Sequence, residues 1–211
     1  MDIHNEARQF IQAEPASRVG SIQALGVTTN HMHVIFLHGG PASGKHTIGV
    51  KLSELTETPL FHNHLAVDAA KSLFAFGTPA FNRMRATIWR SAFAEAVKAG
   101  QSFIFTFNPE STVDPALISE LRSSIESAGG KVHFVQLVCS RKSTLERMAN
   151  ATRTKFGKLT NPELFQAIEA QGGFEFPDLP DALLIIDTDL HDPHAAATLI
   201  AKAVEATKGD S

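Results

Sequence analysis

A glycine-rich run that ends in lysine is the part of the sequence best suited to chemistry. Residues 39–47 read Gly-Gly-Pro-Ala-Ser-Gly-Lys-His-Thr and follow a run at 33–38 whose four central residues are apolar. Glycines let the backbone curl so that several N–H groups point inward, and a following helix adds about half a positive charge at its amino terminus. The lysine would place a cation on the β- and γ-phosphates of a bound nucleotide. The pattern predicts a phosphate-binding loop made of Gly39, Gly40, Pro41, Ala42, Ser43, Gly44, Lys45, His46 and Thr47. A glycine-rich strand-to-helix turn without any ligand is the alternative.

The elements that must position this loop follow a repeating β-α pattern. Strands are expected in five apolar runs, at 33–38, 59–62, 102–107, 132–139 and 183–187. Because most of these runs are unbroken, they suit strands that are covered on both faces, as in a parallel sheet. We therefore expect an α/β three-layer sandwich around a five-stranded parallel sheet, with the ligand at the carboxyl ends of the strands.

Helix boundaries are marked by capping residues and glycines. A capping residue precedes proline at Thr78-Pro79, Asp114-Pro115, Asn161-Pro162 and Asp192-Pro193. Ser143 followed by Glu146 predicts a further start through a capping box. Gly100 and the Gly129-Gly130 pair predict two helix ends, each followed closely by a strand.

The composition is that of one folded domain. The chain has 211 residues, of which 43% are hydrophobic, and its 19 Lys and Arg against 22 Asp and Glu give a net charge of −3. This balance excludes a disordered chain and argues against nucleic acid as the main partner. No segment approaches the about 18 apolar residues that span a bilayer, and one cysteine cannot form an internal disulfide, so we expect a cytoplasmic protein. We divide the chain into an extension at 1–30 and a domain at 31–211.

The run GGPASGKHT resembles the phosphate loop of adenylate kinases and other small-molecule P-loop kinases, in which Gly-Lys is followed by a non-hydroxyl residue and then threonine. The resemblance covers about residues 33–207 and extends to shikimate kinases. It is nearest to a bacterial set described as shikimate kinases or AAA-family ATPases, through the segments FHNHL, IFTF and KFGKLT. It implies that Lys45 and Thr47 match the family's phosphate-binding pair. His46 replaces the usual Mg²⁺-binding hydroxyl, so Thr47 is the loop's candidate metal ligand.

In these kinases the acceptor binds beyond the second strand, which implies an acceptor region at 61–98. Here that strand continues into His62-Asn63-His64 and then Asp68, with imidazoles in place of the aspartates of shikimate kinases. His62 and Asn63 are candidates for binding the acceptor, and His64 or Asp68 could remove its hydroxyl proton, because histidine titrates near neutrality. A zinc site and simple hydrogen-bonded histidines remain alternatives.

Further acceptor ligands are expected on the next helix and strand. Arg83 and Arg90 are seven residues apart, so they share a helix face and could bind an anionic acceptor, although such arginines are more often solvated. The third strand ends at Phe107 without the aspartate or glycine triplet of related kinases. Metal positioning would then fall to Thr106, Asn108 or another group, the same two residues are candidates for binding the acceptor, and shikimate itself is an unexpected acceptor.

The resemblance also implies a lid at 147–160 and a base-binding turn. Arg153 would close over the γ-phosphate and neutralise charge in the transition state, while Arg147 would assist or pair with a carboxylate. Asp187 and Thr188 match the turn beside the adenine.

The sequence thus predicts an ATP- and Mg²⁺-dependent phosphotransferase acting on a small hydroxyl- or phosphate-bearing acceptor, as a monomer or homodimer. A nucleotide-binding switch or NTPase without an acceptor is the alternative.

Overall fold

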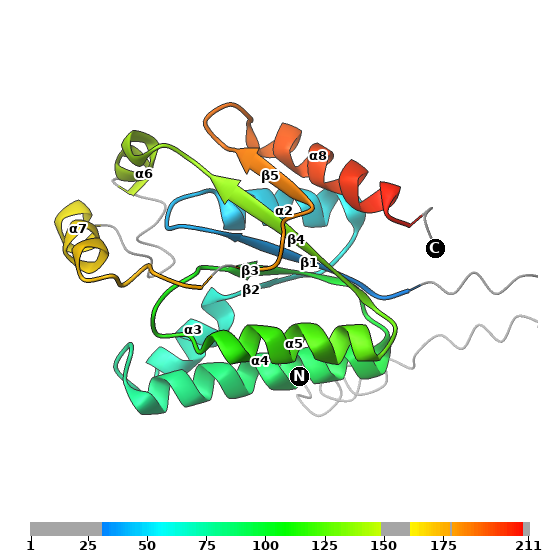
Figure 1. Cartoon of the computed structure of the whole chain (residues 1–211), viewed down its shortest axis with the longest axis horizontal. Helices are drawn as coiled ribbons and strands as arrows, with labels where there is room; N and C mark the ends of the chain where they lie inside the picture. Colours follow the sequence, from blue (N-terminus) through cyan, green and yellow to red (C-terminus); the bar gives the residue numbers. More distant parts are fainter. Residues whose placement is uncertain (1–30, 149–160, 178, 209–211) are drawn as a thin grey trace, which may run out of the picture. The chain divides into compact units, whose positions relative to one another are not determined.

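The computed structural model describes residues 31–148, 161–177 and 179–208. Its centre is a parallel sheet with the strand order β2-β3-β1-β4-β5 (Figure 1). The strands are β1 (His33–Gly39), β2 (Leu60–His62), β3 (Phe103–Phe107), β4 (Lys131–Val138) and β5 (Leu184–Asp187). The predicted α/β fold with a five-stranded parallel sheet is confirmed, and each expected run overlaps one strand.

Helices cover both faces of the sheet (Figure 1). One face carries α2 (Lys45–Thr56) and α8 (Pro193–Ala206), which pack on each other. The other face carries α3 (His64–Lys71), α4 (Pro79–Ala99) and α5 (Pro115–Ser127). Two shorter helices, α6 (Arg141–Met148) and α7 (Pro162–Ala170), lie toward the carboxyl edge of the sheet, at the left of Figure 1. No helix in the described ranges is both long and apolar enough to cross a membrane.

Capping residues begin the helices largely as predicted. The side chains of Thr78, Asp114, Asn161 and Asp192 each accept a backbone N–H, and a proline occupies the first helical turn in every case. The predicted start at Ser143 is wrong, because α6 begins at Arg141. There the Ser140 hydroxyl accepts the Ser143 N–H at 3.2 Å, so the capping residue lies three positions earlier.

Two hydrophobic clusters hold the layers together, because successive residues of a strand point to opposite faces. Toward α4 and α5, Phe36 packs against the rings of Phe105 and Phe134, and Trp89 of α4 meets Phe105 edge to face. Toward α2 and α8 the core is aliphatic and includes Leu37. Burying each large side chain contributes about 1.5–3 kcal/mol, so the sheet is a rigid support for the residues at its edges.

The strand register brings three chain segments together at the carboxyl edge. Gly39 of β1 lies opposite Leu137 of β4, and His62 of β2 lies opposite Thr106 of β3. A Cβ atom on Gly39 would lie 2.3 Å from the Leu137 carbonyl oxygen, so only glycine fits where the loop leaves the sheet. The polar residues that follow β1, β2 and β3 therefore start from neighbouring positions.

Candidate functional site

The loop between β1 and α2 has the backbone of an anion site. Ala42 and Gly44 adopt positive φ angles of 63° and 88°, which turn the chain back toward the sheet. Gly44 occupies the N-cap of α2 and has no side chain to accept a hydrogen bond, and the first turn of α2 has no acidic residue. The N–H groups of a first helical turn have no partner within the helix. A bound phosphate oxygen could accept them.

Lys45, the first residue of α2, is held against this loop. Its Nζ donates to the carbonyl oxygens of Gly39 and Gly40, both at 2.7 Å. It also donates to the Asn108 amide oxygen at 3.3 Å, which connects the loop to the end of β3. The ammonium group thus lies among neutral acceptors, beside a helix amino terminus. That arrangement suits a phosphate, because the Gly39, Gly40 and Asn108 oxygens that accept from Lys45 carry no formal charge.

A buried histidine just before the loop was missed by sequence reasoning. His38 is the sixth residue of β1, is 6% exposed, and its Nε2 has no hydrogen-bond partner within the described ranges. Burial, with a smaller effect of Lys45, lowers the pKa of His38 to about 4. The ring is therefore neutral near pH 7, and Lys45 carries the positive charge of this region. The available signal was a histidine that directly follows four apolar residues within a strand.

The segment after β2 lies against the start of α2. The rings of His46 and His62 meet edge to face with their centroids 4.9 Å apart, and His64 lies 6.2 Å from His62. The Asn63 N–H donates to the Thr106 hydroxyl at 3.1 Å, so this turn is tied to β3. The structure therefore places the predicted acceptor residues after β2 beside the start of α2. His46, predicted as part of the loop, is also a neighbour of the acceptor segment.

Thr47 of the loop and Asp68 of the acceptor segment are exposed. Thr47 follows His46 in the first turn of α2, and Asp68 lies one helical turn after His64 on α3. Across the residues that the structure describes, no group of three or more His, Cys, Asp or Glu side chains is arranged to hold a metal ion. The zinc alternative therefore has no support from the histidine cluster.

The structure does not bring Arg90 to the phosphate loop. Its guanidinium donates from Nε and Nη2 to Glu120 of α5 at 2.8 Å, in a pair of which about half is exposed. Arg90 also lies eleven residues into α4, about 16 Å from the helix start at about 1.5 Å per residue. Arg83 is exposed as well, in agreement with a shared solvent face. Neither arginine contacts the loop, because this face of α4 points away from the sheet.

Arg85, to which the sequence analysis gave no role, is the buried arginine of α4. It is 2% exposed and pairs with Glu110, which follows β3. Helical spacing could have suggested that Arg85 faces inward, because it lies four residues after Phe81 and four before Trp89. The partner could not be read from the sequence.

Arg147 joins α6 to the turn after β5. Its Nη1 donates to the Thr188 hydroxyl at 2.7 Å, and its Nη2 donates to Asp189 at 2.9 Å. Hydrogen bonds from Ser140 lower the pKa of Asp189 to about 2, so this carboxylate stays charged. Asp187 accepts the Asp189 N–H at 2.9 Å and so shapes the same turn. The carboxylate pairing considered for Arg147 is therefore present, in the predicted base-binding turn. Arg153 and the predicted lid from 149 to 160 lie outside the described residues.

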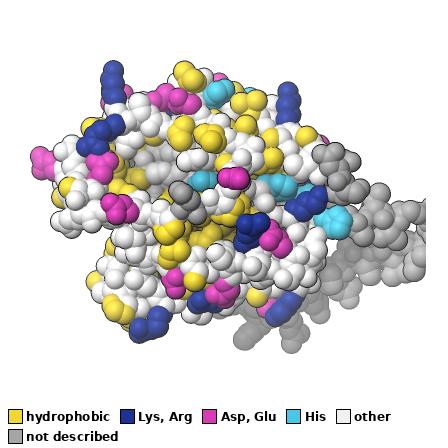
Figure 2. Space-filling view, viewed as in Figure 1, with side chains coloured by type: hydrophobic (Ala, Val, Ile, Leu, Met, Phe, Trp, Pro, Cys, Tyr) yellow, Lys and Arg dark blue, Asp and Glu magenta, His cyan; other side chains and the backbone are white. Residues whose placement is uncertain are grey.

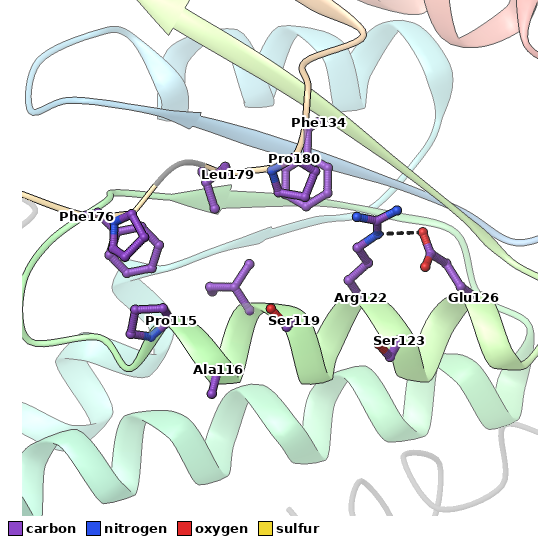
Figure 3. Close-up of a pocket in the computed structure, with 12 residues that line it drawn as sticks. Pro115, Ala116, Ser119, Arg122, Ser123, Glu126, Phe134, Phe176, Leu179 and Pro180 are labelled. Atoms are coloured by element: carbon purple, nitrogen blue, oxygen red, sulfur yellow. Dashed lines mark hydrogen bonds and ion pairs between the residues drawn. The ribbon is translucent and has the colours of Figure 1, made fainter.

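A cavity of about 370 Å³ lies elsewhere, between α5 and the chain before β5 (Figure 3). Phe134, Phe176, Leu179 and Pro180 line it, and the Arg122–Glu126 pair closes one end. Yellow side chains gather in the hollow at the middle of this face in Figure 2. None of the predicted site residues lines this cavity.

Comparison with known proteins gives structural relatives only. No family model and no curated protein matches the chain. Among solved structures, a gluconokinase from Sinorhizobium meliloti is 18% identical, with a TM-score of 0.56 over 85% of this chain and 97% of that chain. An APS kinase from Mycobacterium tuberculosis, solved with AMPPNP and APS, is 14% identical, with a TM-score of 0.56 over 83% and 98%. A shikimate kinase from Aquifex aeolicus is 18% identical, with a TM-score of 0.50 over 82% and 96%. The chain therefore has the fold of P-loop small-molecule kinases.

Proposed function

We propose that this protein is an ATP-dependent phosphotransferase that moves the γ-phosphoryl group to a small hydroxyl- or phosphate-bearing acceptor. One observation carries the proposal: Lys45 lies inside a curled loop at a helix amino terminus, with the histidine segment of β2 beside the same first turn. The loop supplies donors for a nucleotide's phosphates, and the segment supplies groups for an acceptor. Phosphoryl transfer needs both in one place.

In the proposed mechanism the loop holds the phosphates of ATP. First-turn N–H groups of α2 and the Lys45 ammonium neutralise charge that shifts toward the leaving oxygen. Asn108 keeps Lys45 at the loop through its 3.3 Å contact. The turn at Asp187 and Thr188, fixed by Arg147, would border the base.

The oxygens near the loop fit Mg²⁺ that is held mainly by phosphate. Thr47 supplies a hydroxyl and Asn108 an amide oxygen, whereas the nearest carboxylate after β3, Glu110, is bound to Arg85. Mg²⁺ keeps several waters and substrate oxygens and needs few protein ligands. When bound, it would neutralise charge on the phosphates.

The acceptor would lie beside His62, Asn63 and His64. His64 or Asp68 would take the proton from an attacking hydroxyl, because both follow β2 at the same edge of the sheet. The names of the structural relatives support this class of reaction, since gluconokinase, APS kinase and shikimate kinase are all kinases of small molecules.

An acceptor screen tests the proposal. The full chain is assayed for ADP formation with ATP and Mg²⁺ across sugars, nucleosides, nucleotides and small hydroxy acids. We expect at least one acceptor class to raise ADP formation above the rate with water. Calorimetry with AMPPNP measures nucleotide binding in parallel. Binding that no acceptor converts into faster turnover would contradict the proposal.

That contrary result would favour a second candidate, a nucleotide-binding switch or NTPase. The observation behind it is the position after β3, where related kinases usually have an aspartate and this chain has Asn108. Glu110 does not replace it, because its carboxylate is bound to Arg85 and Thr112. The candidate segment after β2 favours the kinase.

A further inference from the structure

Arg85 makes polar contacts that packing of the hydrophobic core alone would not require. Its Nη1 donates to the Glu110 carboxylate at 2.5 Å and to the Thr112 hydroxyl at 3.3 Å, and its Nη2 donates to the Thr112 carbonyl oxygen at 2.8 Å. The guanidinium also lies over the rings of Phe81 and Trp89, at 5.2 and 5.3 Å from their centroids. A side chain of α4 therefore holds both the backbone and a carboxylate of another segment.

That segment is the connection from β3 to α5, residues 108–114. It begins with Asn108, whose amide oxygen accepts from Lys45. A turn closed by the Val113 N–H on the Glu110 carbonyl follows, and the Ser111 N–H donates to Gly173 at 3.1 Å. The contacts of Arg85 with Glu110 and Thr112 add to these bonds and help to fix the shape of the connection that carries Asn108.

An arginine is suited to this task and a lysine is not. The planar guanidinium presents several donors in fixed directions, and here two of its nitrogens reach a carboxylate, a hydroxyl and a carbonyl together. A lysine ammonium is a single flexible point of charge. A buried ion pair is weak support for stability as such, because desolvation opposes the attraction. Its retention in an aromatic core points to a requirement for geometry.

The pair also neutralises a carboxylate that lies two residues after Asn108, because Glu110 is bound by the Arg85 guanidinium. Arg85 and the Thr112 hydroxyl, at 2.8 Å, both bind the same carboxylate oxygen.

We propose that Arg85 is a positioning residue for phosphoryl transfer: through Glu110 and Thr112 it fixes the connection after β3, so that Asn108 stays against Lys45. The inference rests on the proposed function and extends it to a residue that contacts neither nucleotide nor acceptor. Loss of the fixed geometry is expected to slow transfer more than nucleotide binding, because the backbone loop still holds the phosphates.

Hydrogen exchange of the full chain tests the positioning directly. Arg85→Lys keeps the charge and loses the planar fork, and we expect faster amide exchange at 108–113, about tenfold, with other segments unchanged. Arg122→Lys is the matched control, because Arg122 pairs with Glu126 on the surface of α5. Unchanged exchange at 108–113 in Arg85→Lys would overturn the proposal. Since this measurement needs no turnover, it decides the point even if no acceptor is found.

A kinetic cycle then tests the link to Asn108. For Arg85→Lys we expect kcat with the identified acceptor to fall about tenfold, while the Kd for AMPPNP changes less than about threefold. In an Asn108→Ala background the same substitution should have little further effect, because Arg85 acts through Asn108. If the kcat losses of the two substitutions instead multiply, the proposal is overturned. It is also overturned if Arg85→Lys lowers the melting temperature but leaves kcat unchanged at temperatures well below unfolding. Glu110→Gln serves if Arg85→Lys does not fold, with the same expected kcat loss.

Discussion

The two edges of the sheet use similar residues for different purposes. At the carboxyl edge, Lys45 and the segment after β2 lie beside the loop between β1 and α2, whose backbone suits an anion. At the amino edge, His33 Nδ1 and His133 Nε2 are 2.8 Å apart, and the His33 N–H donates to the Ser102 hydroxyl at 2.9 Å. There the polar groups satisfy one another.

The difference follows from the direction of the strands. In a parallel sheet every strand leads into a helix at its carboxyl edge, so helix amino termini with unpaired N–H groups gather there. Strands begin at the opposite edge, where the chain arrives from the carboxyl ends of helices. There the polar groups need only to pair with one another. An edge is a binding site when donors remain without internal acceptors.

The largest effect is expected at Lys45. Lys45→Ala should lower turnover about 100- to 1000-fold, because the cation that neutralises the transferred phosphoryl group is lost. AMPPNP calorimetry should also show weaker binding at an unchanged melting temperature. Lys51→Ala, on the same helix in an exposed pair with Glu54, is the control. Equal loss in both variants would break the distinction between the site and its surroundings.

A methyl group at the start of the loop should have the next largest effect. Gly39→Ala would force a Cβ to within 2.3 Å of the Leu137 oxygen, whereas a Cβ at Gly40 meets nothing within 4 Å. We expect Gly39→Ala to destabilise the fold by about 2–3 kcal/mol in urea unfolding and Gly40→Ala by less than about 1 kcal/mol. Similar values for the two would mean that the loop is not tied to β4.

The amino edge should make stability depend on pH. Burial, with smaller effects of His33, Lys131 and Lys208, lowers the pKa of His133 to about 4 from its ordinary 6.5. The unfolded chain therefore binds more protons between these values, and stability falls as the pH falls through this window. When the pH is lowered from 7 to 5, we expect the free energy of unfolding to fall by about 2 kcal/mol more in the unsubstituted protein than in His133→Gln.

Urea unfolding at both pH values, with and without AMPPNP, sharpens this test. The part of the pH dependence that is due to His133 should be the same in both series, because His133 lies opposite Ile35, toward the edge of the sheet away from the proposed nucleotide site. His38→Gln is the companion variant, since the pKa of His38 is also lowered to about 4 but at the carboxyl edge. If AMPPNP changed the pH-dependent stability that His133 contributes, the division of roles between the two edges of the sheet would be wrong.

The smallest effect is expected at Arg90, which belongs to neither edge. Its exposed pair with Glu120 should be worth less than about 1 kcal/mol, so Arg90→Gln should barely change unfolding or turnover. Steady-state kinetics with the identified acceptor provides the check. A raised KM for the acceptor would restore Arg90 as a ligand and contradict its assignment to the surface.

Local signals explain what the sequence could predict. The sheet and four helix starts depend on unbroken apolar runs and on a capping residue before proline, which act within a few positions. The start of α6 was misplaced because two serines, Ser140 and Ser143, can both cap and only the chain path selects one. The partners of Arg85 and Arg90 lie 25 and 30 residues away, so which of the two arginines is buried depends on how α4 meets the segments after β3. His38 was missed for the same reason, because its surroundings come from other strands.

The two carbonyl bonds of Lys45 have a consequence for the entropy of ligand capture. A lysine side chain that must become ordered when a ligand arrives loses up to about 2 kcal/mol of rotamer freedom at that moment. Here Nζ is already fixed by Gly39 and Gly40. The Lys45 side chain therefore loses that freedom when the chain folds, and not when a triphosphate binds.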